Sequence, residues 1–492
     1  MPRFICAIDQ GTTGTTVIIL DDELQIRAKV NKEFEQIYPK PSWVEHNPEA
    51  IWGSTLATVA EAHRQAGLAE GDIAAIGITN QRETTVIWDR ATGEPIHNAI
   101  VWQDRRTRGR IQQLIDDGNE QWVQKRSGLM LDPYFAGTKI EWILDHVDGA
   151  RARAQRGELA FGTIDSFLLW RLTGGEVHKT DASNASRTLL MNLDDIAWDD
   201  ELLELFNVPR PLLPEIASNS EVYGVARGIE GIEDGTPICG MAGDQHAALF
   251  GQCCFEAGQA KCTFGTGAFL LMNTGSERVH SEHKLLSTMG WQIDGEVTYA
   301  MEGSAFIAGA MVQWLRDGLG IIESAADIER LARSVEDSGE IVAVPALSGL
   351  GAPHWEPSAR GVIWGLTRGT TDAHIARAAL EGIALQNVDV LNAMESDSGA
   401  ELVDMRVDGG ATANDLLMQM QADFLGRKIV RPAITETTSL GAALLAGLNQ
   451  GIFTGLDQIR DEWRIDREFE PQMTTAEREV HLDLWHEGLK RV

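Results

Sequence analysis

The sequence predicts an α/β protein built from two similar domains with a cleft between them. Strand-like and helix-like stretches alternate in the first half, which is typical of α/β folds. A short apolar strand that enters a glycine- and threonine-rich turn occurs once in each half, at residues 4–16 and 260–267. The length of 492 residues exceeds what one hydrophobic core usually supports. We therefore expect two domains, 1–250 and 251–492, with the junction near Gly251.

The first predicted element is a β-hairpin. Apolar runs at 4–8 and 17–20 flank the polar segment Asp9-Gln10-Gly11-Thr12-Thr13-Gly14-Thr15-Thr16. Glycine lets the backbone approach a ligand closely, and threonine hydroxyls add donors beside the amides. Such donors next to the Asp9 carboxylate suit a polyphosphate and its divalent cation. The alternative is an ordinary hairpin without a ligand, and a Walker A loop is excluded because no Gly-Lys-Thr follows.

The elements that follow are assigned from hydrophobic periodicity. Helices are predicted over 51–66, 372–391 and 440–448, and strands over 73–79 and 85–88. In the second half, the run 405–407 leads into a second glycine-rich segment, Asp408–Asn414. We expect the charged segment from Asp457 to the end to be helical and peripheral.

Composition excludes several classes of function. The chain has 42 basic and 73 acidic residues, for a net charge of −31. Such a surface repels nucleic acid and anionic lipid, so neither is expected as a partner. No apolar run reaches 18 residues, so no membrane insertion is predicted. The cysteines lack CxxC spacing and stand mostly in apolar settings: Cys6, Cys239, Cys253, Cys254 and Cys262. With no secretory signal, this pattern favours reduced, buried thiols in a cytoplasmic protein.

Further polar segments accompany the predicted strands and turns. Arg82 and Glu83 follow the strand at 73–79, and Asp244 stands between a glycine turn and an alanine-rich run. Thr266-Gly267 and Asp408–Ala411 lie in the second half. Each segment alone has a plain explanation, such as a solvated ion pair for Arg82 and Glu83 or a helix N-cap for Asp244. Their order and spacing together indicate a phosphoryl-transfer site at the domain junction.

Six sequence blocks carry a resemblance to the FGGY carbohydrate kinases. They are DQGTT at Asp9, FEQIYPKPSWVEHNPEAIW at Phe34, GITNQRETTVIWDRATGEPIHNAIVWQDRRT at Gly77, DPYFAGTK at Asp132, AGDQHAALFGQ at Ala242 and GLGAPHWEPSARG at Gly349. The likeness spans about Phe4 to Glu470 and is strongest to members that phosphorylate glycerol. It implies an α/β fold of two actin-like (ribonuclease-H-like) domains with an interdomain active-site cleft. It also implies ATP-dependent phosphorylation of glycerol to sn-glycerol 3-phosphate.

The resemblance implies a set of glycerol ligands. The matching residues are Arg82, Glu83, Trp102, Tyr134, Asp244, Gln245 and Phe269. A guanidinium donates to hydroxyl oxygens and a carboxylate accepts from hydroxyl protons, which suits Arg82 and Glu83. Trp102 and Phe269 match apolar walls, although a core role is the alternative for each. Asp244 matches the catalytic base, with Arg82 beside it in the catalytic pair.

The resemblance also implies a nucleotide site and a Mg²⁺ site. The matching nucleotide residues are Thr12, Thr13, Gly14, Thr16, Thr266, Gly309, Gln313, Gly410 and Asn414. Asp9 and Asp244 match the carboxylates on the metal side. Glycerol and ATP/ADP are thus the expected small-molecule partners, and we expect a homo-oligomer, either a dimer or a tetramer.

Three departures from the family pattern stand out. His246 occupies a position where a second glutamine is common, and Ala136 one where serine is common. The segment 224–237 holds a single basic residue, Arg227, whereas some members bind an inhibitory sugar bisphosphate there. We therefore expect no such anion control. The alternatives to glycerol phosphorylation are a kinase for another small polyol or ketose, and an actin-like ATPase that has lost phosphoryl transfer.

Overall fold

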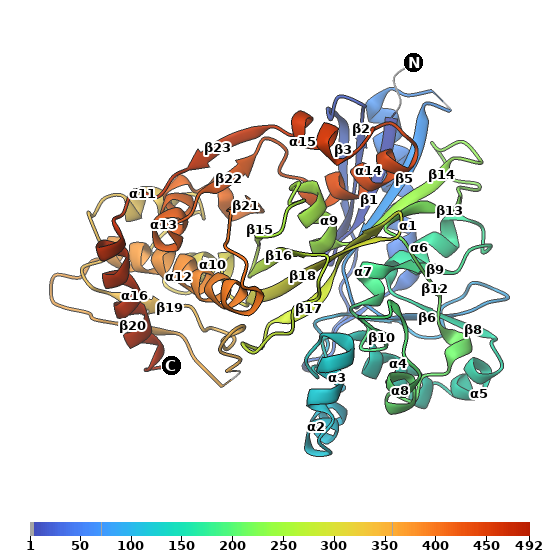
Figure 1. The fold of residues 1–492 in the computed structure, drawn as a ribbon, viewed down its shortest axis with the longest axis horizontal. Helices are drawn as coiled ribbons and strands as arrows, with labels where there is room; N and C mark the ends of the chain where they lie inside the picture. The colour runs from blue at the N-terminus through green and yellow to red at the C-terminus, as the bar shows by residue number, and fades with distance from the viewer. Residues whose placement is uncertain (1–3, 70, 357) are drawn as a thin grey trace.

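The computed structural model describes residues 4–69, 71–356 and 358–492. Residues 1–3 and 70 of the predicted first domain, and Pro357 of the block at 349–361, lie outside the described residues. Two large β-sheets form the framework. Figure 1 shows the first sheet in the blue-to-green half on the right, while the second extends from the centre to the left.

The first sheet has six strands in the order β13-β14-β5-β1-β2-β3. Its strands are β1 (Phe4–Gln10), β2 (Gly14–Leu20), β3 (Ile26–Glu33), β5 (Ile73–Asn80), β13 (Ser220–Val225) and β14 (Pro237–Gly243). β1 pairs antiparallel with β2, which confirms the predicted hairpin, and parallel with β5. Asp9 stands opposite Thr16 on one side and Thr79 on the other. The hairpin turn and the end of β5 therefore meet at one edge of the sheet.

The second sheet repeats this plan. Its order is β17-β18-β16-β15-β21-β22-β23. Its strands are β15 (Gln259–Phe264), β16 (Ala268–Gly275), β17 (Leu286–Ile293), β18 (Glu296–Ala305), β21 (Asp404–Asp408), β22 (Ile429–Pro432) and β23 (Ile465–Phe469). β15 pairs antiparallel with β16 and parallel with β21, as β1 does with β2 and β5. The internal duplication suggested by the two turns is thus present in the strand order.

Helices and short strands complete the fold. The helices are α1 (Pro48–Ala66), α2 (Arg108–Asp116), α3 (Glu120–Ser127), α4 (Ala136–His146), α5 (Ala150–Gln155), α6 (Ile164–Leu172), α7 (Ala182–Ala185), α8 (Asp200–Leu205), α9 (Asp244–Gly251), α10 (Gly309–Asp317), α11 (Asp327–Ala332), α12 (Asp372–Ser398), α13 (Asp415–Leu425), α14 (Thr437–Asn449), α15 (Leu456–Glu462) and α16 (Thr475–Leu489). The short strands are β4 (Glu45–His46), β6 (Val86–Asp89), β7 (Ala99–Ile100), β8 (Leu159–Gly162), β9 (Lys179–Asp181), β10 (Met191–Asn192), β11 (Ala197–Trp198), β12 (Glu215–Ala217), β19 (Val342–Val344) and β20 (Val362–Trp364).

The predicted helices and strands agree with the structure except near the C-terminus. α1 begins after Asn47, whose side chain accepts from the Glu49 N–H, and ends at Gly67 in the left-handed conformation. The segment from Asp457 is not helical throughout, because β23 lies between α15 and α16 and pairs with β22. Nor is it wholly peripheral, since Trp485 of α16 is fully buried. The charged, exposed face of β23 concealed its strand character, because an edge strand buries little.

α14 connects the two halves. Although it follows the second sheet's strands β21 and β22 in the chain, it packs on β1, β5 and β14 of the first sheet and on α9. A Cβ added at Gly441 would lie 1.8 Å from the Ala247 carbonyl oxygen, so only glycine permits this helix contact. The small residues of 440–447 therefore serve close packing, which places Ser439 of α14 beside the first hairpin.

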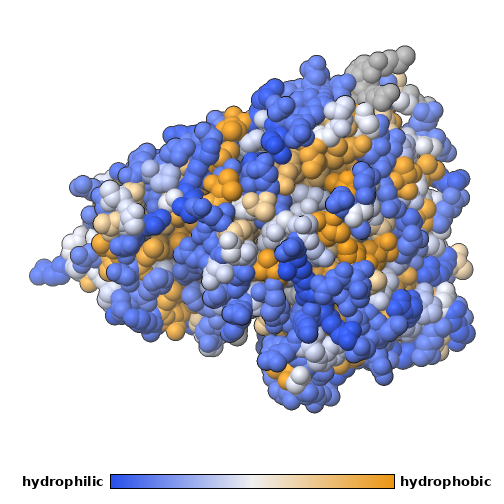
Figure 2. Space-filling view, in the orientation of Figure 1, coloured by the Kyte–Doolittle hydropathy of each residue, from blue (hydrophilic) through white to orange (hydrophobic). Residues whose placement is uncertain are grey.

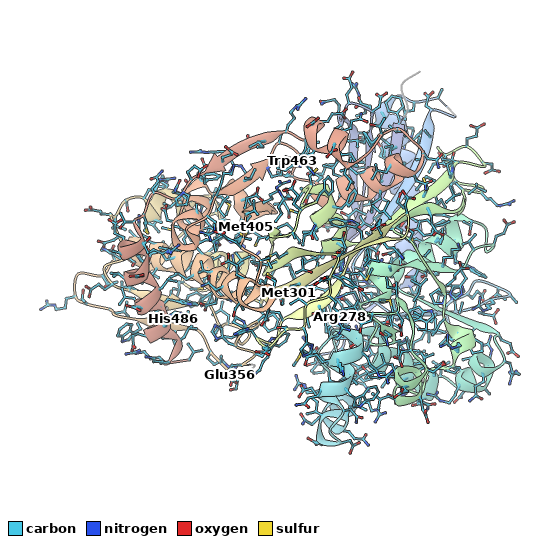
Figure 3. All side chains as sticks on the ribbon, viewed as in Figure 1. Arg278, Met301, Glu356, Met405, Trp463 and His486 are labelled. Carbon is cyan, nitrogen blue, oxygen red and sulfur yellow. The ribbon has the colours of Figure 1, made fainter. Side chains whose placement is uncertain are left out.

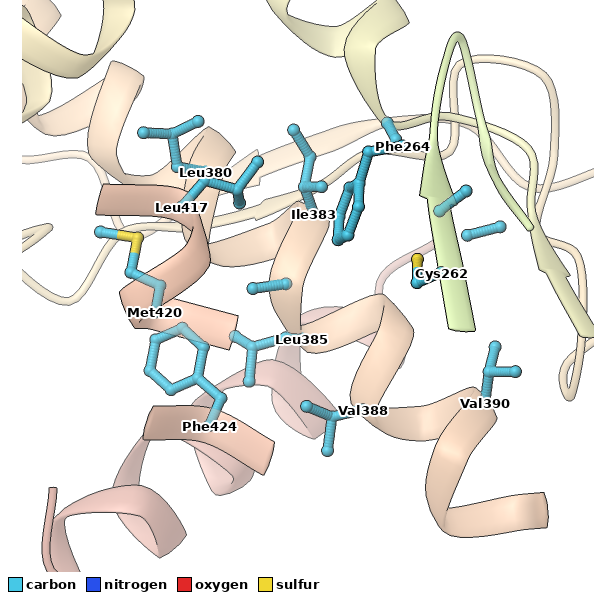
Figure 4. Packing of buried hydrophobic residues seen from close by; sticks show 14 of the residues in the cluster. Cys262, Phe264, Leu380, Ile383, Leu385, Val388, Val390, Leu417, Met420 and Phe424 are labelled. Atoms are coloured by element: carbon cyan, nitrogen blue, oxygen red, sulfur yellow. The ribbon is translucent and has the colours of Figure 1, made fainter. Parts of the chain in front are cut away.

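The core of the second half lies between its sheet and two helices. Figure 4 shows Cys262 and Phe264 of β15 with Ile383 and Val388 of α12 and Phe424 of α13. The five cysteines are free and buried, as the sequence predicts. Figure 2 shows a largely hydrophilic face interrupted by apolar patches. Among the described residues, no helix has the length and apolar character needed to cross a membrane.

Candidate active site

The site begins where β5 ends. Arg82 and Glu83 follow this strand after Gln81 and are almost fully buried, with exposed fractions of 2% and 1%. The surface ion pair considered from sequence is therefore wrong for these two residues. Glu83 has a φ of 60°, a left-handed conformation that is costly for a non-glycine residue and that clusters at functional sites. Arg187 Nε donates to Glu83 Oε1 at 2.8 Å and helps to hold the side chain.

Arg82 connects the predicted base to the second half of the molecule. Its Nε lies 3.0 Å from Asp244 Oδ1. Its two terminal nitrogens bind the two carboxylate oxygens of Glu302, and Nη2 also donates to the Tyr134 hydroxyl at 3.4 Å. Because a guanidinium carries five fixed N–H groups, these partners define its plane.

Asp244 is the first residue of α9, and Gly243 is the N-cap. The N-cap interpretation of Asp244 is therefore wrong. Burial raises the pKa of Asp244 above its ordinary value, and the Arg82 guanidinium opposes that rise. The raised pKa makes this carboxylate a better proton acceptor, while Arg82 and the N-terminal end of α9 favour its ionised form, which is the form that can accept a proton. Gln245, also predicted as a ligand, follows it and is mostly buried.

Aromatic side chains from both halves form a small cavity. Trp102 and Tyr134 come from the first half and Phe269 from β16, and the Trp102 ring centroid lies 5.6 Å from that of Tyr134 and 6.5 Å from that of Phe269. The cavity has a volume of about 100 Å³ and is also lined by Glu302. Trp102 Nε1 donates to Thr12 Oγ1 at 2.9 Å, which connects this wall to the hairpin turn. The core interpretation of Trp102 and Phe269 is thus not supported.

Asp9 lies near the end of β1, opposite Thr16 and beside the first hairpin turn. Burial, followed by the negative charge of Asp244, raises the pKa of Asp9 to about 7, and a hydrogen bond from Ser439 opposes the shift. Two repelling carboxylates of this kind fit a divalent cation, which would neutralise both. No group of three or more potential metal-binding side chains occurs among the described residues. Mg²⁺ would therefore take its other ligands from phosphate and water, as is usual for this ion.

The predicted phosphate residues occupy the two hairpin turns. Thr12 and Thr13 lie in the first turn, and a Cβ on Gly14 would come within 2.8 Å of the Lys32 carbonyl oxygen. Thr16 already accepts a hydrogen bond of 2.9 Å from Asn31. In the second turn, the Thr266 carbonyl accepts from the Ala308 N–H at 2.8 Å, which places Gly309 beside it.

The remaining predicted nucleotide residues lie on other elements of the second half. Gln313 is exposed on α10, and Gly410 has open space around its Cα. Asn414 caps α13, because its Oδ1 accepts from the Leu417 N–H at 2.9 Å. Throughout the part of the chain that the structure describes, no hydrogen bond joins these three residues to Arg82 or Asp244.

Sequence reasoning missed several charged residues of the site. Glu302, Arg187, Lys139 and Lys261 are each buried and contact predicted ligands. Lys139 donates to backbone oxygens of Glu83 and Tyr134, and burial lowers its pKa to about 7. The available signal was a charge inside an apolar strand, as in Tyr299-Ala300-Met301-Glu302 and Ala260-Lys261-Cys262. Such charges are buried only when they find partners.

The departures from the family pattern have simple structural settings. His246 is buried, its Nε2 lies 3.1 Å from Thr288 Oγ1, and burial holds its pKa well below the ordinary value. It is therefore a neutral, packed histidine. Ala136 is buried as the first residue of α4. Arg227 is exposed and donates to Glu176 at 2.7 Å.

Comparisons with known proteins give consistent results. The N-terminal domain model of the FGGY family of carbohydrate kinases matches residues 4–251, and its C-terminal domain model matches residues 260–449. A glycerol kinase of Myxococcus xanthus is 56% identical over 491 residues, covering 99% of both chains. One of Deinococcus radiodurans is 55% identical, covering 99% of this chain and 97% of its own.

Solved structures share the fold. A Plasmodium falciparum glycerol kinase with ADP has a TM-score of 0.95 at 37% identity, covering 100% of this chain and 98% of its own. A gluconate kinase of Lactobacillus acidophilus has a TM-score of 0.89 at 23% identity, covering 100% of this chain and 98% of its own. The predicted two-domain, actin-like α/β fold is confirmed by these matches.

Proposed function

This chain belongs to the FGGY family of carbohydrate kinases, and we propose that it transfers the γ-phosphoryl group of ATP to glycerol, giving sn-glycerol 3-phosphate. Curated relatives at 54–56% identity over nearly the whole chain are glycerol kinases. The observation that carries the proposal is the cluster of Arg82, Glu83 and Asp244. Arg82 of this cluster contacts Tyr134 and Glu302, which line the small aromatic cavity. Trp102 of the same cavity contacts Thr12 of the first turn.

Substrate binding follows from the polarity of these groups. A triol has several hydroxyls on a short apolar edge. Trp102 and Phe269 cover such an edge, while Arg82 donates to hydroxyl oxygens and Glu83 accepts hydroxyl protons. Holding two or three hydroxyls at once fixes the reacting oxygen in line with phosphorus, which is the main demand of phosphoryl transfer.

Proton transfer falls to Asp244. Its raised pKa makes it a better proton acceptor than an exposed carboxylate, and the hydroxyl becomes acidic as its bond to phosphorus forms. Asp9 and Asp244 would hold Mg²⁺, which when bound supplies positive charge to the phosphate oxygens. In this proposal the hairpin turn residues Thr12, Thr13, Gly14 and Thr266 donate to the phosphates.

The rest of the nucleotide site is part of the same proposal. Gly309, Gln313, Gly410 and Asn414 would contact ribose and adenine, and Thr16 would lie at the edge of the phosphate site. The units 1–250 and 251–492 would close on the substrates and exclude water, suppressing ATP hydrolysis. Cytoplasmic location and a dimeric or tetrameric assembly remain predictions.

A single assay tests the proposal against its alternatives. ADP release is measured with glycerol, with xylulose and with neither. We expect release only with glycerol, because Trp102 and Phe269 narrow the cavity against longer substrates. Release with xylulose would identify a ketose kinase. Equal release without any acceptor would identify an ATPase.

A further inference from the structure

We propose that Glu302 is a positioning residue that reaches from the second half of the molecule to orient Arg82 and Arg187 in the substrate site of the first half. The proposal rests on the function proposed above and adds a residue to it. Glu302 lies on β18, where Figure 3 labels its neighbour Met301 near the middle of the molecule.

The strand determines where Glu302 points. Successive side chains of a strand alternate between its two faces. Gly303 faces the core, because an added Cβ would meet Val390 at 2.4 Å. Glu302 and Ser304 therefore face the other way, and both line the cavity with Phe269. Ser304 pairs with Phe269 in the sheet, so the second half contributes a continuous wall to this cavity.

The contacts of Glu302 join two arginines. Its Oε2 accepts a hydrogen bond from Arg82 Nη1. Its Oε1 accepts two more, from Arg82 Nη2 and from Arg187 Nη2, and both of these measure 3.1 Å. The two-point contact with Arg82 is geometrically specific, because the guanidinium fork matches the carboxylate. Arg187 in turn holds Glu83, so one carboxylate supports both Arg82 and Glu83.

Glu302 is negatively charged at neutral pH. Burial alone would raise its pKa, but the Arg187 and Arg82 guanidinium groups outweigh burial and hold the pKa at about 2. If Glu302 were neutral, each arginine would still keep one carboxylate partner, Asp244 for Arg82 and Glu83 for Arg187. Loss of the Glu302 charge should therefore leave neither arginine without a carboxylate partner. It should instead allow the Arg82 guanidinium to adopt other orientations. Arg82 would then turn toward Asp244.

The bridge spans the two halves. Arg82, Glu83 and Arg187 belong to the first half, whereas Glu302 belongs to the second-half sheet. The oriented guanidinium therefore exists only while the halves are docked as in this structure. Correct placement of the acceptor hydroxyl is thereby coupled to the relative position of the two sheets.

The test compares Glu302→Gln with Glu302→Asp in the full chain. We expect kcat/KM for glycerol to fall about 10–150-fold in Glu302→Gln, the effect of a lost hydrogen bond to a charged group. KM for ATP should change less than about twofold, because the contacts of Glu302 lie on the acceptor side. Glu302→Asp keeps the negative charge. Its kcat/KM for glycerol should therefore fall less than that of Glu302→Gln.

Controls separate the possible failures. Glu296→Gln changes an exposed carboxylate at the start of the same strand and should behave as the unchanged chain. Melting temperature reports whether each variant is folded. An unchanged kcat/KM in Glu302→Gln, equal losses in the Gln and Asp variants, or a matching rise of KM for ATP would overturn the positioning role. Failure of the unchanged chain to phosphorylate glycerol would instead refute the proposed function.

Discussion

The two hairpin turns occupy equivalent places in the two sheets but differ in chemistry. Asp9 of β1 stands between Thr16 of β2 and Thr79 of β5. Thr263 of β15 stands between Phe269 of β16 and Asp408 of β21. The backbone plan is the same, yet one position holds a carboxylate and the other a hydroxyl.

This difference shows that two sheets with the same strand pairing contribute different side chains to one site. The first-half edge gathers Asp9, Arg82, Glu83 and Asp244, to which the proposed function assigns a cation, the acceptor hydroxyls and a proton. The second-half edge contributes the Phe269 wall, the Glu302 carboxylate and the Thr266 turn. The same strand pairing thus provides position in both sheets, while single side chains determine the chemistry that each edge offers. The predictions below challenge this division, beginning with the largest expected effect.

The largest effect should come from the base of the first half. Asp244→Asn should lower kcat about 10²–10⁴-fold, the usual range for general-base catalysis, while ATP still binds. The measurement is kcat of the purified variant together with an ATP-binding assay. Turnover within about threefold of the unchanged enzyme, well below that range, would assign the base to another residue.

Arg82→Ala should act on the acceptor rather than the nucleotide. A lost hydrogen bond from a charged group costs about 1.5–3 kcal/mol, or roughly 10–150-fold in KM for glycerol if binding is uniform. KM values for both substrates are measured in parallel. An unchanged KM for glycerol with a large rise in KM for ATP would show that Arg82 contacts the nucleotide. That result would contradict the proposed division of roles between the two sheet edges.

The paired variants Asp9→Asn and Thr263→Ala test the equivalent positions directly. Asp9→Asn should raise the Mg²⁺ concentration needed for half-maximal activity by at least about tenfold, since even indirect contacts to a metal cost 10–100-fold in affinity. Thr263→Ala should leave that requirement unchanged. Activity is titrated with Mg²⁺ at fixed ATP. Equal shifts in both variants would show that both edges face the metal.

A smaller effect is expected on melting temperature, through the charge of the surface. In the site, arginines pair with carboxylates, whereas the chain as a whole carries a large excess of negative charge. The net charge of −31 causes self-repulsion that salt screens, with a Debye length of about 10 Å at 0.1 M and about 3 Å at 1 M. Melting temperature without ligands should therefore rise with KCl up to molar concentration. A flat or falling curve would mean that the charges are locally balanced.

The smallest expected effect is an absence of inhibition. Fructose 1,6-bisphosphate should not inhibit, because a bisphosphate needs several donors at once and Arg227 is the only basic residue of 224–237. Arg227 is also paired with Glu176. Steady-state rates with millimolar bisphosphate at fixed salt are the measurement. Saturable inhibition would reveal an anion site elsewhere.

Much of the fold could be predicted from local patterns. The hairpin at Asp9 and the helices α1, α12 and α14 follow from periodicity and turn chemistry, which act over a few residues. The resemblance supplied Arg82 and Asp244, and the structure places them 3.0 Å apart. β23 could not be predicted, because its charged face resembles a solvated helix and only pairing with β22 makes it a strand.

The sequence by itself determined the hairpin turns, the buried cysteines and the polar residues at the ends of strands, because those depend on neighbouring residues. The tertiary structure alone decided that Glu302 meets Arg82 across 220 positions and that Ser439 meets Asp9 across 430. A buried charge has no short-range signature beyond its presence in an apolar strand. A buried charge meets its partners only when distant strands and α14 pack together. Without those partners, the free-energy cost of burying the charge would be too high.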